Sequence, residues 1–202
     1  MRRNKIMAQS VKEVLGDYKK ELIENINKID EDAFQKIIDI LLEAYKNDKN
    51  VFIMGNGGSA GTANHFVCDF GKNAVAGDYR RYRIMSLCDN VEKITALGND
   101  IAFDEIFRQQ LKNLMHDGDV VIAVSASGNS PDLTKALEYA KEKNGKIIAL
   151  AGFKGGKIKE MSDVSLVAEM ESYERIEDMH LMFLHMIVCW MKVNQNVLQN
   201  YN

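Results

Sequence analysis

Three serines gather in one short segment of the chain, Ser125-Ala126-Ser127-Gly128-Asn129-Ser130-Pro131. The segment follows an apolar run at residues 120–124 and leads into a helical pattern, in which Ser130 suits the N-cap and Pro131 the first helical position. Hydroxyl groups and the free N–H groups of a helix start together form a neutral cradle for a phosphate dianion. A loop that only capped the helix would need Ser130 alone, so the additional Ser125 and Ser127 favour a phosphate site.

Glycine dominates a second loop, Gly55-Asn56-Gly57-Gly58-Ser59-Ala60-Gly61, which follows an apolar run at residues 51–54. Glycine lets the backbone turn tightly and approach a ligand closely, and the helix that follows offers N–H groups to an anion. The loop lacks the lysine of a nucleotide-binding P-loop, and its glycine spacing differs from the dinucleotide fingerprint. A ligand-binding loop and a plain strand-to-helix turn both remain open here.

Histidines and carboxylates recur at helical spacing in two places. His65, Cys68 and Asp69 share one helix face, because the second and third residues follow the first by three and four positions. Glu177 and His185 lie eight positions apart, which is about two turns, and they also share a face. Two such pairs could supply four ligands to one divalent metal, and the imidazoles favour zinc. Ordinary core or surface histidines are the alternative, since nothing local brings the two helices together.

Short apolar runs that alternate with helical patterns must position these residues. The strands that we expect lie at residues 51–54, 83–87, 120–124, 146–151 and 164–168. Such alternation predicts an α/β fold with a doubly wound five-stranded parallel sheet, whose ligands bind beyond the carboxyl ends of the strands. We expect a single domain over residues 1–202. Its parts are an N-terminal helical hairpin at 8–47, the sheet core at 50–170 and a long C-terminal helix at 173–200.

The composition argues against several classes of partner. The 202 residues are 46% hydrophobic and 27% charged, with a net charge of -3, and so lack the basic excess of a nucleic-acid-binding protein. No apolar stretch is long enough to span a bilayer, and the basic start is followed by charged residues rather than by the apolar part of a signal peptide. Cys68, Cys88 and Cys189 lack metal-finger spacing and, as an odd number, favour a reducing cytoplasm. We therefore expect a cytoplasmic protein without nucleic-acid or membrane partners.

As a set, these residues resemble the SIS (sugar isomerase) domain family and, within it, the phosphoheptose isomerases. The resemblance covers nearly the whole chain. It rests on motifs in a specific order, namely Gly55-Asn56-Gly57-Gly58-Ser59, His65-Phe66, Gly98-Asn99-Asp100, Ser125-Ala126-Ser127-Gly128-Asn129-Ser130, and Arg175-Ile176-Glu177 continuing to His185. It implies the flavodoxin-like SIS fold.

The resemblance also implies a reaction, a cofactor and an assembly. Phosphoheptose isomerases interconvert sedoheptulose 7-phosphate and a heptose 7-phosphate aldose, D-glycero-D-manno-heptose 7-phosphate or a close relative, for polysaccharide heptose synthesis. They are homotetramers whose active sites lie between subunits, and many bind zinc. By position, the substrate would be held by Asn56, Gly57, Gly58, Ser59, Asn99, Asp100, Ser125, Ala126, Ser127 and Ser130. The metal and acid/base positions would fall on His65, Asp69, Glu177 and His185.

Two of these positions depart from the family pattern. The family usually has glutamate where this chain has Asp69, and glutamine where it has Glu177. Our hypothesis is that Asp69 or Glu177 moves the carbon-bound proton, that His185 is the partner acid, and that zinc polarises the carbonyl. A metal-free reaction that uses the same residues stays open, and so does Cys68 as a thiolate ligand.

Two further functions compete with this reading. One is a SIS isomerase of another sugar phosphate, which the changes at Asp69 and Glu177 keep open. The other is a non-catalytic SIS protein that binds the replication initiator. Such proteins retain much of the glycine loop and the first histidine, so these residues alone do not separate the two classes.

Overall fold

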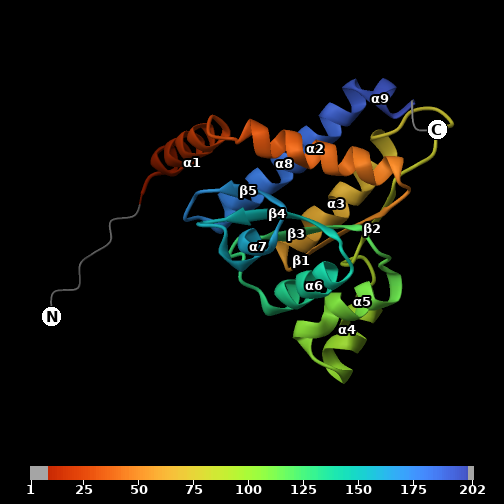
Figure 1. The fold of residues 1–202 in the computed structure, drawn as a ribbon. Coiled ribbons are helices and arrows are strands. Elements are labelled where there is room, and N and C mark those ends of the chain that lie inside the picture. The colour runs from red at the N-terminus through yellow and green to blue at the C-terminus, as the bar shows by residue number, and fades with distance from the viewer. Residues whose placement is uncertain (1–8, 200–202) are drawn as a thin grey trace.

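The predicted strands form one parallel sheet. In the computed structural model, which describes residues 9–199, five strands lie in the order β2-β1-β3-β4-β5 (Figure 1). The strands are β1 (Asn50–Gly55), β2 (Arg83–Ser86), β3 (Val120–Ser125), β4 (Lys146–Gly152) and β5 (Val164–Ala168). After β2 the chain crosses back over β1 to β3, so the strand order reverses between β1 and β3. This confirms the doubly wound α/β fold.

Helices cover both faces of the sheet (Figure 1). One layer contains α2 (Glu31–Lys46), α3 (Gly58–Asn73) and α8 (Tyr173–Val193). The other contains α5 (Ile106–Leu114), α6 (Pro131–Glu142) and α7 (Gly156–Met161). The remaining helices are α1 (Val11–Ile26), α4 (Val91–Asp100), the 3-10 turn η1 (Phe103–Glu105) and α9 (Gln195–Gln199). Within residues 9–199, none of the helices has the length and apolar character needed to cross a membrane.

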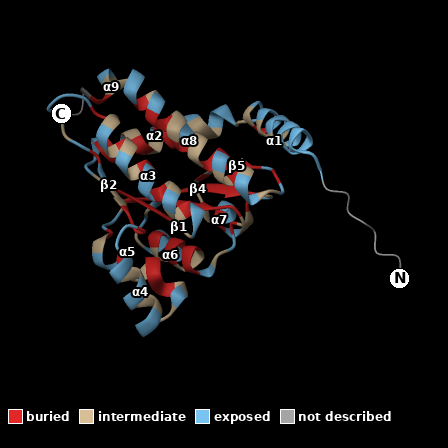
Figure 2. Ribbon diagram, turned by 180° about the vertical axis from the view of Figure 1, so that it is seen from behind, coloured by how far each residue is buried: buried red, intermediate tan, exposed pale blue. Residues whose placement is uncertain are grey.

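Burial explains the composition of the strands. All six residues of β3 are buried, and β1 and β4 are buried from their second residue onward. Continuous apolar burial is what strands covered on both faces require. The edge strand β5 instead alternates buried and half-buried positions. Figure 2 shows the buried residues concentrated in the sheet and on the helix faces turned toward it.

The two N-terminal helices form where the periodicity predicts them, but α1 does not fold back along α2 as a closed hairpin. In Figure 1, α1 extends away from the body of the molecule. Its second half is tied to α8 by the Tyr18 hydroxyl, which donates to Asp178, and by an ion pair between Glu21 and Arg175. Leu22 and Ile26 pack against the core, whereas its other apolar side chains stay exposed; they are Val11, Val14, Leu15 and Ile23.

The final helix ends earlier than predicted. α8 stops at Val193, where Asn194 is the C-cap, and the short helix α9 follows. The periodicity of the sequence continues across this break, so the pattern alone predicted one helix to residue 200. The predicted boundaries at residues 8 and 200 lie outside the residues that the structure describes.

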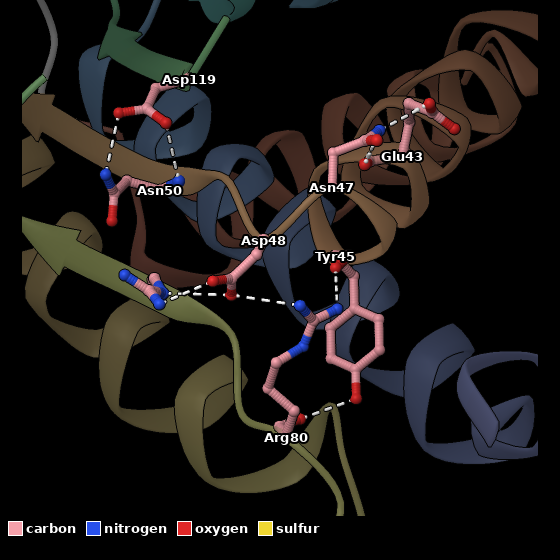
Figure 3. Close-up of polar contacts among 8 residues, drawn as sticks. Glu43, Tyr45, Asn47, Asp48, Asn50, Arg80 and Asp119 are labelled. Carbon is pink, nitrogen blue, oxygen red and sulfur yellow. Dashed lines mark hydrogen bonds and ion pairs between the residues drawn. The ribbon is translucent and has the colours of Figure 1, made fainter. Parts of the chain in front are cut away.

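Polar contacts close the amino end of β1 (Figure 3). Asn50 donates its backbone N–H and its side-chain Nδ2 to the two carboxylate oxygens of Asp119, each over 2.9 Å. Asp119 is 1% exposed and accepts a third bond from the backbone N–H of His116 over 2.8 Å. Beside this pair, Asp48 forms an ion pair with Arg80 over 3.2 Å. The turn from α2 into β1 is therefore fastened to the segments that precede β2 and β3.

Candidate functional site

The serine and glycine loops meet where the strand order reverses. β1 and β3 are neighbours, with Gly55 opposite Val124, so the two loops leave the carboxyl edge of the sheet side by side. In doubly wound sheets this reversal point is where a crevice forms between the diverging connections. The fold thus brings together the two loops that the sequence marked as candidates.

The serine loop has a defined shape. Ser125 Oγ accepts a bond from the backbone N–H of Gly128 over 3.1 Å, and Ser127 Oγ accepts one from Asn129 over 3.3 Å. Ser130 is the N-cap of α6 as predicted, with Pro131 at the first turn, but its side chain caps no helix N–H group. Its hydroxyl is therefore not engaged by the first turn of α6.

The serine loop rests directly on the turn between β4 and α7. Gly128 has a φ of +65°, and a Cβ at this position would lie 2.1 Å from the carbonyl oxygen of Gly155. The Gly128 carbonyl accepts from the N–H of Ile158 over 3.0 Å, and the Asn129 side chain accepts from the N–H of Lys157 over 3.1 Å. Only glycine fits so close a backbone contact, and the turn after β4 thereby holds the serine loop in place.

In the glycine loop, a carboxylate lies against the start of α3. Gly57 is the N-cap of α3 with a φ of +55°. A Cβ on Gly58 would lie 2.3 Å from Oε2 of Glu177, so the side chain of Glu177 occupies the space that the glycine leaves. Negative charge is favourable at a helix N-terminus. Ser59, the next residue, is buried at 4% exposure.

Asn56 connects the glycine loop to the helix after the serine loop by bonding to Asp132, a residue that the sequence did not identify as a candidate. Its Nδ2 donates to Oδ2 of Asp132 in the first turn of α6, over 2.7 Å. Both residues line a cavity of about 430 Å³ together with Ser130 and Phe103. The only local signal for Asp132 was an acidic residue in a first helical turn, which is common for reasons of helix stability.

Asn99 and Asp100 lie apart from the two loops. Both are exposed at the end of α4, where Asn99 Nδ2 donates to Asp100 Oδ1 over 2.8 Å. The segment that follows them, Ala102 to Asp104, lines the cavity with Asn56. The structure therefore places these two predicted sugar contacts near the rim of the cavity rather than in its wall.

The two predicted histidine–carboxylate pairs come together in part. His65 Nε2 lies 3.2 Å from Asp69 Oδ2, and His185 Nε2 lies 3.4 Å from the same oxygen. The two imidazole Nε2 atoms are 3.3 Å apart. Packing of α3 against α8 thus supplies the long-range contact that the spacing of the residues did not.

These three donors fit a divalent metal. In a tetrahedral zinc site with bonds of about 2.1 Å, neighbouring ligand atoms lie about 3.4 Å apart. The three separations in this group, 3.2, 3.3 and 3.4 Å, match that spacing. Two imidazoles and one carboxylate are also a common donor set for zinc. His65, Asp69 and His185 could therefore hold one metal ion and leave a fourth position for a further ligand.

Glu177 and Cys68 lie outside this group. Among the described residues, the candidate metal ligands that come together here are His65, Asp69 and His185. Glu177 is instead directed at Gly58, two turns before His185 on α8. Cys68 is a free, exposed thiol. Three residues of the predicted four-ligand set therefore come together, and the fourth, Glu177, lies beside the glycine loop.

His180 is buried rather than presented to the site. It lies on α8 and is 0% exposed, and neither of its ring nitrogens has a hydrogen-bond partner within good geometry. Burial lowers its pKa to about 4, and the nearby Ala151 carbonyl opposes this shift. A charged imidazole is disfavoured in such an environment, so His180 is a neutral core residue.

Comparison with known proteins agrees with this architecture. Residues 16–152 match the SIS domain family. The chain is 34% identical to the phosphoheptose isomerase of Helicobacter pylori (strain ATCC 700392 / 26695) over 172 residues, 83% of this chain and 87% of that protein. It is 37% identical to that of Citrifermentans bemidjiense over 159 residues, 77% and 80% of the two chains.

A solved structure is similar over almost the whole chain. The phosphoheptose isomerase GmhA of Neisseria gonorrhoeae superposes with a TM-score of 0.83 at 29% identity, covering 91% of this chain and 100% of that one. The chain therefore belongs to the SIS domain family and, within it, to the phosphoheptose isomerases.

Proposed function

We propose that this protein interconverts sedoheptulose 7-phosphate and a heptose 7-phosphate aldose, as an aldose–ketose isomerase in polysaccharide heptose synthesis. The observation that carries the proposal is the meeting of the serine loop and the glycine loop at the reversal point of the sheet. The relatives named phosphoheptose isomerase support the same reaction. They do not favour the replication-initiator alternative or another sugar phosphate.

The serine loop would bind the phosphate group. Ser125, Ser127 and Ser130 offer hydroxyls, and Ala126 offers its backbone amide. Because the turn after β4 already holds the loop, little ordering is needed when the phosphate arrives. A phosphate held away from the reacting carbons orients the sugar chain, and its binding energy contributes to the rate.

The glycine loop would receive the sugar. Asn56 offers a side-chain amide at the cavity, while Gly57 and Gly58 let the backbone approach closely. Ser59 follows at the buried start of α3, and Asn99 and Asp100 stand at the rim. These residues give the hydroxyl groups of a sugar several hydrogen-bonding partners.

Isomerisation requires a base that moves a proton between C1 and C2 and an acid that serves the oxygens. Asp69 and Glu177 are the carboxylates at the acid/base positions, and in a metal-free reaction His185 would be the partner acid. Asp69 is shared by both imidazoles, whereas the carboxylate of Glu177 lies beside the glycine loop. The family usually has glutamine, which cannot act as a base, at the position of Glu177, so Asp69 and Glu177 both stay candidates for the group that moves the carbon-bound proton. Zinc held by His65, Asp69 and His185 would polarise the carbonyl oxygen when bound.

Assembly would complete the site. Along α3, His65 lies seven residues after Gly58, which at 1.5 Å per residue is about 10 Å from the glycine loop. His65 is exposed, so a neighbouring copy can reach it. The exposed apolar side chains of α1 and an apolar groove between α2 and α8 support contact between copies. We propose a homotetramer of single SIS domains with active sites at the subunit interfaces, located in the cytoplasm.

The reaction can be tested by NMR of the purified protein with sedoheptulose 7-phosphate in D₂O and zinc. We expect a new aldose signal with deuterium at C2, because the proton that the base returns exchanges with solvent. Glu177→Gln and Asp69→Asn then separate the two carboxylates: loss of the signal in the first with retention in the second would support Glu177. Absence of exchange from a metal-loaded tetramer would contradict the proposal, and binding to the replication initiator without turnover would support the alternative.

A further inference from the structure

Asp132 is a buried carboxylate that the proposed reaction does not use. It lies two residues after Ser130 in the first turn of α6 and is 2% exposed. Burial raises its pKa, and the bonds from the Asn56 amide and from the backbone N–H of Leu133 oppose this rise. A carboxylate buried this deeply is costly unless its partners compensate, so its place in the wall of the cavity calls for an explanation.

The bond to Asp132 determines which way the amide of Asn56 faces. Among the described residues, the hydrogen-bond partners of Asp132 are all N–H donors, and an ionised carboxylate can only accept. The part of Asn56 that faces Asp132 is therefore the NH₂ group, 2.7 Å from Oδ2. The carbonyl oxygen Oδ1 is left on the opposite side of the amide, where it can accept a bond from a ligand.

We propose that Asp132 is a positioning residue, which holds Asn56 as a hydrogen-bond acceptor for a hydroxyl group of the sugar. The inference rests on the proposed function, since it takes Asn56 as a sugar contact. It assigns Asp132 to recognition of the sugar rather than of the phosphate.

Charge supports this division of roles. A carboxylate at the start of α6 repels an anion, so Asp132 opposes phosphate binding at the adjacent Ser130. Lys135, one turn further on, does not neutralise it, because its ammonium group is paired with Asp104 over 2.7 Å and with Glu105 over 3.2 Å. A residue kept for the phosphate would carry no negative charge.

The chain contains a matched control at the other end of β1. Asn50 Nδ2 donates to Asp119 Oδ2 over 2.9 Å, and Asp119 is 1% exposed. The pair has the same residue types, the same bond and the same burial as Asn56 and Asp132. It lies at the amino edge of the sheet (Figure 3), and neither of its residues lines the cavity.

The test compares Asp132→Asn with Asp119→Asn. Each variant is assayed for kcat/KM with sedoheptulose 7-phosphate, for inhibition by inorganic phosphate, and for thermal unfolding. In Asp132→Asn the amide of Asn56 is no longer fixed, so we expect kcat/KM to fall about 10- to 100-fold. Inhibition by phosphate should stay the same or become tighter, because a negative charge is removed. Asp119→Asn should lower Tm and leave both kinetic values within about twofold.

A second comparison shows whether Asp132 acts through Asn56. Asn56→Ser and the double variant Asn56→Ser/Asp132→Asn should have the same kcat/KM, since the position of a missing amide no longer matters. This comparison does not need the single variant Asp132→Asn.

Three outcomes would overturn the inference. The first is a kcat/KM of Asp132→Asn within about twofold of wild type. The second is a loss of phosphate inhibition in Asp132→Asn that is proportional to its loss of kcat/KM. The third is a double variant whose kcat/KM lies below that of Asn56→Ser by the full factor that Asp132→Asn causes in the wild-type protein. Absence of turnover in the wild-type protein would instead count against the proposed function.

Discussion

Strand β1 has an asparagine at each end, and each donates a side-chain hydrogen bond to a buried aspartate. Asn50 bonds to Asp119 at the amino end over 2.9 Å, and Asn56 bonds to Asp132 beyond the carboxyl end over 2.7 Å. At the amino end the backbone N–H of Asn50 also bonds to Asp119, which ties two segments of backbone together. At the carboxyl end Asn56 bonds through its side chain, Asp132 also accepts from the backbone N–H of Leu133 in its own helix, and both Asn56 and Asp132 line a cavity.

The difference shows how one chemical pair serves two purposes. Where the aspartate binds the backbone N–H of the asparagine as well as its side chain, the pair contributes to stability. Where the asparagine keeps one half of its amide toward a cavity, the pair can orient a group for a ligand. The residue types are therefore the same at the two ends of β1. What differs is whether the asparagine backbone is also bound to the aspartate and whether the asparagine side chain lines a cavity.

The largest effect should come from His185, and His116 at the amino end of β1 provides the control. We expect His185→Ala to lower kcat by about 10³-fold, since general acid catalysis contributes factors of this size. Thermal unfolding should change little, because the side chain is 43% exposed. His116→Ala, at the amino end and 81% exposed, is the control and should keep full activity. Turnover above a tenth of wild type in His185→Ala would contradict the assignment.

The buried His180 should make the free energy of unfolding depend on pH. The pKa of His180 is lowered to about 4 from 6.5, so the unfolded state binds more protons between these pH values. Its contribution to stability is present above pH 6.5 and is lost as the pH falls toward 4, about 3 kcal/mol in all. We expect His180→Leu to flatten this part of the pH dependence of the unfolding free energy, measured with urea. An unchanged slope in the variant would rule out His180 as its source.

At the amino end, Asp119→Ala should reduce stability without affecting the reaction. The substitution leaves the partly buried N–H groups of Asn50 and His116 without their acceptor, which costs about 2 kcal/mol. Urea unfolding measures the loss, and kcat/KM of the folded protein should stay within about twofold of wild type. Asp17→Ala on the exposed face of α1 should change stability by less than about 0.5 kcal/mol. A fall in kcat/KM for Asp119→Ala would show that the amino end is coupled to the site.

The smallest effect is expected at the start of α3. In Gly58→Ala the new Cβ displaces the carboxylate of Glu177, which lies 2.3 Å from its position, so kcat should fall about tenfold. Stability should change little, because the end of a flexible side chain can move. Gly61→Ala on the same helix meets nothing within 4 Å and should behave as wild type. Equal activity of the two variants would remove Glu177 from the reaction.

Much of the fold could be predicted because its signals are local. Short apolar runs located all five strands, and Ser130 and Pro131 located the start of α6. The pairing of His65 and Asp69 with His185 needed the packing of α3 on α8, which no local pattern contains. Asp132 was missed for the same reason. Its partner Asn56 lies 76 positions earlier in the chain, and an acidic residue in a first helical turn has an ordinary explanation.

The contact of Gly128 with the turn at Gly155 also bears on how the protein responds to a ligand. A loop that must first become ordered loses conformational freedom on binding, whereas this loop is already fixed by the backbone of a second one. The N–H of Ile158, which donates to Gly128, should therefore exchange with solvent slowly in the free protein. The serine loop is thus a rigid receptor, and any adjustment to different sugars has to come from the glycine loop and the rim beyond α4.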